Sequence, residues 1–377
     1  MTPVSFEDWR AAARRRLPRV LFDYIDGGSY AEHTLRRNAA DLAAVELRQR
    51  VMRDVSAVST GTTLLGQALS MPVLLAPVGL SGMYARRGEV QAARAAKAAG
   101  VPFCLSTVGI CSVEEVAAGA GTPPWFQLYM IRDRGVMTAL LDRAQALGSP
   151  ALILTVDLPV PGARYRDARR GLFGGGPATQ IRQAWDGISH PAWLWDVQVC
   201  GRPHSFGNIA SAASEAKGFA DFWVWISRSF DPTLTWADLD WIRARWRGPV
   251  IVKGVLDPED ARAAARAGAD AIVVSNHGGR QLDGATSSIA ALPKVVDAVG
   301  SSLPVLMDGG VRSGLDVLKA VTLGARACLI GRPWAFALAA QGEAGVAALL
   351  ERMRAELVTA MQLTGTLRLG EGEVGEG

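Results

Sequence analysis

The chain has 377 residues, of which 49% are hydrophobic and 20% charged, so it carries ample apolar surface for a large core and differs from disordered sequences. Its net charge of +4 is carried almost wholly by arginine, because only five of its 40 basic residues are lysines. The arginines are dispersed among acidic residues, which argues against a nucleic-acid-binding stripe and favours a small anionic substrate.

The four cysteines show no CxxC pairing, which argues against a disulfide framework and predicts a reducing compartment; no metal site is expected. The N-terminus lacks the apolar core of a signal peptide. No run of about 18 apolar residues is present to span a bilayer. We therefore expect a cytoplasmic protein in which any membrane contact is peripheral.

From residue 72 onward, short β-rich runs alternate with helical patterns, which is typical of repeated βα units and a parallel sheet. Helical spacing is clear over residues 88–99, 257–267 and 313–323. No GxGxxG motif follows the first strand, so the pattern predicts a (β/α)₈ TIM barrel rather than an open sheet, with functional residues at the carboxyl ends of its strands. The predicted strands span residues 72–78, 102–107, 124–130, 151–158, 249–254, 271–276, 304–308 and 327–331.

Two regions lie outside this repeat, although we predict one domain over residues 1–377. Residues 1–71 form a helical N-terminal preface to the barrel of residues 72–370, and residues 371–377 form an acidic tail. Residues 159–234 interrupt the fourth unit as a long excursion, which is typical of a lid or a binding segment.

Within the excursion, residues 171–230 are rich in aromatic and arginine side chains. We predict that this segment is mobile, covers the barrel mouth and is the main contact with a membrane or its quinone, because aromatic rings favour the bilayer interface. Packing of the same rings on the barrel or on a neighbouring subunit is the alternative. The aromatic residues are Trp185, Trp193, Trp195, Phe206, Phe219, Phe222, Trp223 and Trp225.

The strongest local motif follows the sixth predicted strand, where His277 and Arg280 are separated by two glycines. A histidine at a strand end can act as a general base, and an arginine beside it can hold a substrate carboxylate. Asp157 ends the fourth strand and is a candidate to orient His277, and Arg164 is a second candidate carboxylate ligand. Taken singly, His277 and Asp157 could instead cap their loops and Arg164 could lie on the surface.

Lys253 directly follows an apolar strand and should point into the barrel mouth, where it could stabilise negative charge on a reduced cofactor. A Schiff-base lysine and a structural salt bridge are the alternatives.

The last two units carry Asp308-Gly309-Gly310-Val311-Arg312 and Gly331-Arg332-Pro333, and the two motifs together predict a phosphate site. Gln127 with Tyr129, and Thr155 with Asp157, form pairs that face the same way along a strand.

Taken together, these motifs resemble the FMN-dependent family that oxidises 2-hydroxy acids, over residues 5–365. Within the family, the stretches at 76–89 and 159–168 are most similar to the bacterial quinone-linked L-lactate dehydrogenases. The most specific segments are Phe22-Asp23-Tyr24 with Gly27-Gly28, Ala76-Pro77-Val78-Gly79, Trp125 to Tyr129, Thr155-Val156-Asp157 and Ser275 to Asp283.

The resemblance implies the roles of individual residues. His277 would remove the hydroxyl proton, oriented by Asp157, while Tyr129 binds the hydroxyl and Lys253 lies by the flavin. Hydride and carbanion routes stay open. The substrate carboxylate would be bound by Tyr24, Arg164 and Arg280. The FMN ligands would be Ala76, Pro77, Val78, Ser106, Gln127, Thr155, Lys253, Ser275, Asp308, Gly309, Gly310, Arg312, Gly331 and Arg332.

The resemblance also implies partners: L-lactate or a similar 2-hydroxy acid as substrate, a quinone of the respiratory chain as acceptor, and a homotetramer bound peripherally to the cytoplasmic side of the inner membrane. Three alternatives remain open. They are an oxidase that uses O₂ on lactate, glycolate or mandelate, another FMN barrel such as a diphosphate isomerase, and a non-catalytic ligand-binding barrel.

Overall fold

Eight parallel strands form the centre of the computed structural model, which describes residues 3–172, 174–210 and 219–369. Their order in the sheet is β3-β10-β9-β8-β7-β6-β5-β4, and the ring closes where Leu75 and Phe103 form a single parallel bridge. The predicted TIM barrel is therefore confirmed. The strands are β3 (Val73–Leu75), β4 (Cys104–Ser106), β5 (Trp125–Tyr129), β6 (Leu152–Thr155), β7 (Val250–Val255), β8 (Ala271–Val274), β9 (Val305–Asp308) and β10 (Ala327–Ile330).

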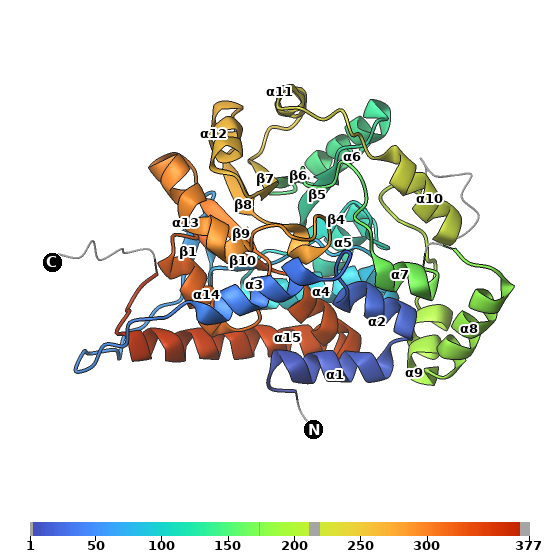
Figure 1. Cartoon of the computed structure of the whole chain (residues 1–377), viewed down its shortest axis with the longest axis horizontal. Helices are drawn as coiled ribbons and strands as arrows, with labels where there is room; N and C mark the ends of the chain where they lie inside the picture. Colours follow the sequence, from blue (N-terminus) through green and yellow to red (C-terminus); the bar gives the residue numbers. More distant parts are fainter. Residues whose placement is uncertain (1–2, 173, 211–218, 370–377) are drawn as a thin grey trace.

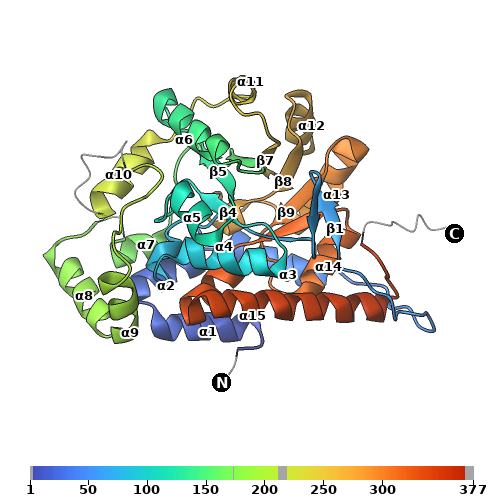
Figure 2. The ribbon, with the colours of Figure 1, turned by 180° about the vertical axis from the view of Figure 1, so that it is seen from behind.

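Helices surround the barrel and cover the outer face of its strands (Figures 1 and 2). Because both faces of each strand are covered, the strands are almost entirely apolar. Polar side chains cap several helices: the Ser313 hydroxyl accepts from the Asp316 amide, and the Asp316 carboxylate accepts from the Ser313 amide. The barrel helices are α4 (Gly88–Ala99), α5 (Val113–Ala120), α6 (Arg134–Ala146), α11 (Ala237–Arg243), α12 (Pro258–Arg266), α13 (Ser288–Val299), α14 (Gly314–Thr322) and α15 (Arg332–Thr364).

The preface differs in part from the sequence prediction. It contains the helices α1 (Phe6–Arg16), α2 (Arg19–Asp26) and α3 (His33–Ala44), and then a hairpin of β1 (Thr62–Leu64) and β2 (Gln67–Leu69). Leu64 and Leu69 pack with the inward-facing residues of the barrel strands, and the indole of Trp125 donates to Gln67 Oε1 at 3.2 Å. The hairpin therefore fills the amino-terminal end of the barrel, which leaves its carboxyl end for the site.

The excursion is largely helical and is tied to the preface and to the loop after β3. The indole of Trp193 donates to the Met83 carbonyl at 2.8 Å, and Arg16 pairs with Asp196 at 2.8 Å. In Figure 1 this part of the chain, around α8 and α9, lies beside α1 and α2 at one end of the molecule. The excursion contains α7 (Tyr165–Arg170), α8 (Pro177–Ile188), α9 (Pro191–Trp193), η2 (Leu194–Val199) and α10 (Phe219–Ser229).

The aromatic side chains of the excursion separate into two groups. Trp193 and Phe206 are buried, so for these two the packing alternative holds, whereas Trp185 and Trp195 are 68% and 67% exposed. The side chains of Phe219, Phe222 and Trp223 lie outside the described residues, as does the predicted acidic tail. No helix in the described ranges is long and apolar enough to cross a membrane. Mobility of the segment stays a prediction, as does the single-domain organisation.

Candidate active site

A large cavity opens at the carboxyl ends of the strands, between the barrel loops and helix α2. Its cavity volume is about 160 Å³, and the cavity is open to solvent at its mouth. Four of the predicted site residues, Asp157, Ser275, Gln127 and Ser106, are not part of its lining. The remaining predicted residues all line it: Tyr24, Ala76, Pro77, Val78, Tyr129, Thr155, Arg164, Lys253, His277, Arg280, Asp308, Gly309, Gly310, Arg312, Gly331 and Arg332.

His277 and Asp157 form a pair at one side of the cavity. The imidazole Nδ1 lies 2.8 Å from Asp157 Oδ1, so the carboxylate fixes the ring and leaves Nε2 for a ligand. The backbone of His277 has a φ of 58°, and its amide donates to Ser275 Oγ at 3.0 Å, which holds this strained turn in place.

Burial lowers the pKa of His277, and the nearby Lys253 lowers it further, although Asp157 opposes both. Burial alone would raise the pKa of Asp157, but the charges of His277 and Lys253 outweigh it and the pKa is lowered. Near neutral pH the pair therefore consists of a neutral imidazole and a carboxylate, which is the state that a general base requires.

Lys253 reaches the cavity from β7 and is held by two partners. Its ammonium lies 3.0 Å from Asp308 Oδ2 and donates to Ser275 Oγ at 2.9 Å. Burial would lower the pKa of Lys253, but Asp308 and Asp157 raise it, so the side chain is cationic. The second oxygen of Asp308 is buried without a hydrogen-bond partner in the described part of the chain. A ligand with hydroxyl groups would satisfy that oxygen.

Ser106, Gln127 and Thr155 connect three neighbouring strands through buried hydrogen bonds. Gln127 Nε2 donates to Thr155 Oγ1 at 3.0 Å, and Gln127 Oε1 accepts from Ser106 Oγ at 3.2 Å. Of the three, only Thr155 lines the cavity. Gln127, which Ser106 holds in place, therefore fixes the orientation of Thr155.

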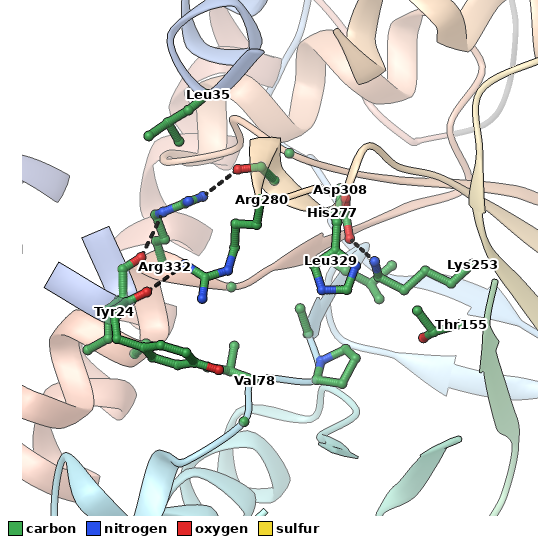
Figure 3. A pocket seen from close by; sticks show the side chains of 18 of the residues that line it. Tyr24, Leu35, Val78, Thr155, Lys253, His277, Arg280, Asp308, Leu329 and Arg332 are labelled. Atoms are coloured by element: carbon green, nitrogen blue, oxygen red, sulfur yellow. Dashed lines mark hydrogen bonds and ion pairs between the residues drawn. The ribbon is translucent and has the colours of Figure 1, made fainter. Parts of the chain in front are cut away.

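Two arginines from barrel loops bind the carboxyl end of helix α2 (Figure 3). Arg280 Nη1 donates to the carbonyls of Tyr24 and Gly27 at 2.5 and 2.9 Å. Arg332 donates to the carbonyls of Ile25, Gly27 and Gly278 at 2.8–3.0 Å. Because a guanidinium has five N–H donors, Nε and Nη2 of Arg280 keep donors for a ligand.

Tyr24 lies between two cationic groups. The guanidinium carbons of Arg280 and Arg164 lie 4.7 and 5.8 Å from the centre of its ring. Arg164 is buried, and its Nε and Nη1 have no hydrogen-bond partner among the described residues. Two such arginines facing one cavity can bind a carboxylate through paired hydrogen bonds.

Gly309, Gly310 and the start of helix α15 form another wall of the cavity. Gly309 and Gly310 have φ values of 91° and 96°, and a Cβ at Gly310 would lie 2.5 Å from the Asn38 carbonyl. Helix α15 begins at Arg332, and the first amides of a helix have no intrahelical acceptor and favour an anion. Arg312 lines this wall, but its guanidinium stacks 4.4 Å from the Phe6 ring.

Several residues that line the cavity were not predicted from the sequence. Ile226 and Phe230 reach the cavity from the end of the excursion, and the ring centres of Phe230 and Tyr129 are 5.5 Å apart. Phe6 and Asn38 line it from the preface. No local motif marks these four residues, because only tertiary packing brings them to the mouth.

A barrel mouth with an anion-binding wall, a buried lysine, a His–Asp pair and two arginines defines a cofactor-binding enzyme that acts on small anions. The family model described as FMN-dependent dehydrogenase matches residues 13–373. The chain belongs to this family, and its cofactor is FMN.

Named relatives span nearly the whole chain. The L-lactate dehydrogenase of Caulobacter vibrioides (strain NA1000 / CB15N) is 61% identical over 361 residues, covering 96% of this chain and 94% of the relative. That of Pseudomonas aeruginosa (strain LESB58) is 56% identical over 364 residues, covering 97% and 95%.

Solved structures share the fold over the same length. The monotopic membrane protein (S)-mandelate dehydrogenase is 35% identical, with a TM-score of 0.92 and 98% of both chains covered. A mandelate oxidase is 40% identical, with a TM-score of 0.83, covering 98% of this chain and 96% of that chain.

The residues present fit FMN. The cofactor has an anionic phosphate, a polyol chain and a planar ring system. The wall of Gly309, Gly310 and the start of α15 suits the phosphate, and the unpartnered oxygen of Asp308 suits a hydroxyl of the polyol. The cationic Lys253 lies beside Asp308, and its charge suits a ring system that gains negative charge on reduction.

Proposed function

We propose that this chain oxidises L-lactate to pyruvate and that a membrane quinone takes the electrons. The observation that carries the proposal is His277, which is paired with Asp157 and lines the same cavity as Arg164 and Arg280. The names of the relatives at 56–61% identity support lactate as the substrate.

For the cofactor, we propose that the wall of Gly309, Gly310, Gly331 and Arg332 holds the phosphate, with Arg312 at its edge. Asp308 would accept from the polyol chain. When bound, FMN supplies the acceptor for the two electrons that leave the substrate carbon. The ring system would be contacted by Ala76, Pro77, Val78, Ser106, Gln127, Thr155, Lys253 and Ser275.

For the substrate, we propose that Arg164, Arg280 and Tyr24 bind the carboxylate, which fixes the hydroxyl-bearing carbon in the cavity. Tyr129 would hold the hydroxyl, and its ring stacks near His277 at 6.5 Å between centres. The hydroxyl proton would pass to Nε2 of His277, and the Asp157 carboxylate would stabilise the resulting imidazolium. In the hydride route, loss of that proton favours departure of the carbon-bound hydrogen with its two electrons. In the carbanion route, Nε2 of His277 would instead take the carbon-bound proton, which leaves the two electrons on the carbon.

For the location, we propose peripheral binding to the cytoplasmic side of the inner membrane through α8 and η2. Ile181, Trp185 and Ile188 have the spacing of one helix face and are 59%, 68% and 57% exposed. On η2, Trp195 is 67% exposed and Val199 is 52% exposed. An apolar face of this kind, with arginines such as Arg182 nearby, is typical of helices that lie in the membrane interface. The solved (S)-mandelate dehydrogenase is described as a monotopic membrane protein.

We keep the homotetramer as a proposal from the family resemblance, and sedimentation of the purified protein tests it. We also propose that residues 1–377 form a single domain, with the preface supplying Tyr24 to the barrel.

The first prediction concerns substrate and acceptor. In anaerobic stopped-flow mixing, L-lactate should bleach the bound flavin and D-lactate should not, because only one enantiomer places its hydroxyl at His277 while its carboxylate meets the arginines. A soluble quinone should then restore the absorbance faster than air-saturated buffer does. Faster reoxidation by O₂ would make the chain an oxidase, and absence of bleaching by L-lactate would reject the substrate.

The second prediction concerns the base. His277→Gln should retain FMN but lower the rate of flavin reduction by about 100-fold or more, the usual scale of general base catalysis. In the unchanged protein, the rate should fall only below the ordinary histidine pKa of about 6.5, because burial lowers the pKa of His277. His33→Gln, at a histidine on the preface, is the control and should change neither FMN binding nor the rate of flavin reduction. A near-normal rate in His277→Gln would remove His277 from the chemistry.

The third prediction concerns the membrane. Replacing Ile181 and Trp185 together by Asp should reduce co-sedimentation with anionic vesicles by about tenfold, because apolar contact area drives interfacial binding. Flavin reduction by L-lactate should stay unchanged. Leu363→Asp, at an exposed apolar position near the end of α15, is the matched control and should bind normally. Unchanged sedimentation of the double variant would refute contact through α8.

A further inference from the structure

Asp167 on helix α7 is a buried carboxylate to which the proposed chemistry gives no role. The residue is 1% exposed, and its Oδ2 has no hydrogen-bond partner in the described ranges. Leaving a buried carboxylate oxygen unpaired costs free energy unless a nearby charge or a ligand compensates it. The surroundings of Asp167 identify that charge.

One cation close to Asp167 is Arg164, which lies one helical turn earlier, and Arg280 also acts on Asp167 by charge. Asp167 Oδ2 lies 4.0 Å from Arg164 Nη1, which is too long for a hydrogen bond but close enough for a strong Coulomb interaction at a buried site. Nε and Nη1 of Arg164 also lack hydrogen-bond partners. The two groups therefore interact by charge while each keeps polar atoms for a third partner.

The other carboxylates around α7 are already engaged. Asp23 pairs with Arg166 and Arg170, and Asp26 pairs with Arg10 and Arg166, all at 2.5–2.8 Å. These contacts leave Asp167 as the carboxylate that faces the substrate arginines rather than a surface network.

Arg164 and Arg280 carry like charges beside the same tyrosine ring. After burial, the charge of Arg280 is the main influence that lowers the pKa of Arg164, and Asp167 opposes it. Burial raises the pKa of Asp167 above its usual value, and the charges of Arg280 and Arg164 offset that rise only in part. Before substrate binds, Asp167 therefore offsets part of the repulsion between the two arginines.

We propose that Asp167 is a positioning residue that acts as a built-in counter-charge to the substrate arginines. It limits how tightly Arg164 and Arg280 hold a carboxylate, so that the 2-oxo acid product can leave. This inference rests on the proposed function, because it assumes that these arginines bind a 2-hydroxy or 2-oxo acid.

The test is calorimetric titration of the FMN-loaded protein with pyruvate. Asp167→Asn should bind pyruvate about tenfold more tightly, since one negative charge near the bound carboxylate is removed. Affinity for neutral lactamide should not change. Glu114→Gln is the matched control: it removes a carboxylate that pairs with Arg143 away from the cavity, and it should leave both affinities unchanged.

A role in packing alone would weaken pyruvate binding or leave it unchanged, and either result would overturn the proposal. Asp167→Thr also removes the charge and replaces the Asn variant in the titration if that variant does not fold. If neither variant binds FMN, Asp167 is required for folding and the proposal fails. Asp167→Glu should keep an affinity close to that of the unchanged protein. If the unchanged protein binds no pyruvate, the proposed function fails instead.

Discussion

The site depends on the binding of two barrel arginines to the carboxyl end of helix α2. The last carbonyls of a helix have no intrahelical donor and lie at the negative end of the helix dipole, so cationic donors stabilise them. Arg280 supplies such donors from the loop after β8, and Arg332 supplies them from the first residue of helix α15. Each charge-assisted bond of this kind is worth about 1.5–3 kcal/mol. The preface is thereby fixed at the barrel mouth.

Close contact between the same segments explains the paired glycines. A Cβ at Gly28 would lie 2.7 Å from the Gly279 carbonyl, and one at Gly279 would lie 2.5 Å from the Leu35 amide. The Ser29 amide donates to the Gly279 carbonyl at 2.9 Å across this contact. Because the backbones approach so closely, Tyr24 from the preface and Arg280 from the barrel face one cavity.

Charge pairing then divides the mouth into two parts. On one side, the buried pair of Lys253 with Asp308 and the partly buried pair of His277 with Asp157 share Ser275. On the other side, the arginines keep donors free for an anion. Figure 3 shows Tyr24, Arg280 and Arg332 together, and Lys253, Asp308 and His277 across from them. In the proposed function, a substrate whose carboxylate is bound by Arg280 and Tyr24 would present its hydroxyl-bearing carbon to His277.

Much of this arrangement could be predicted from the sequence. Apolar runs bounded by turn residues located the eight strands, and polar residues at or just beyond their carboxyl ends located His277, Lys253 and Asp308. The strands could be predicted because the hydrophobic pattern is local. The β1–β2 hairpin could not, since its two strands have three residues each and gain their stability by packing inside the barrel.

The remaining differences also arise from tertiary packing. Phe230 reaches the cavity because it bridges to Ile131, which is far away in the sequence. Arg312 follows a glycine pair that is typical of phosphate loops, yet its guanidinium stacks on Phe6 and lies 3.7 Å from Glu7, and no pattern in the sequence links those segments. Trp193 and Phe206 looked like interface residues, but the loop after β3 and the barrel bury them.

Arg280 holds the preface at the barrel mouth and, in the proposed function, also binds the substrate carboxylate. This double role is tested most directly in Arg280→Lys by measuring amide hydrogen exchange at residues 27–29 together with pyruvate affinity. A lysine ammonium cannot reach two carbonyls and a carboxylate at once with the geometry of a guanidinium. We expect faster exchange and weaker pyruvate binding in the same variant. Weaker binding with unchanged exchange would contradict the account.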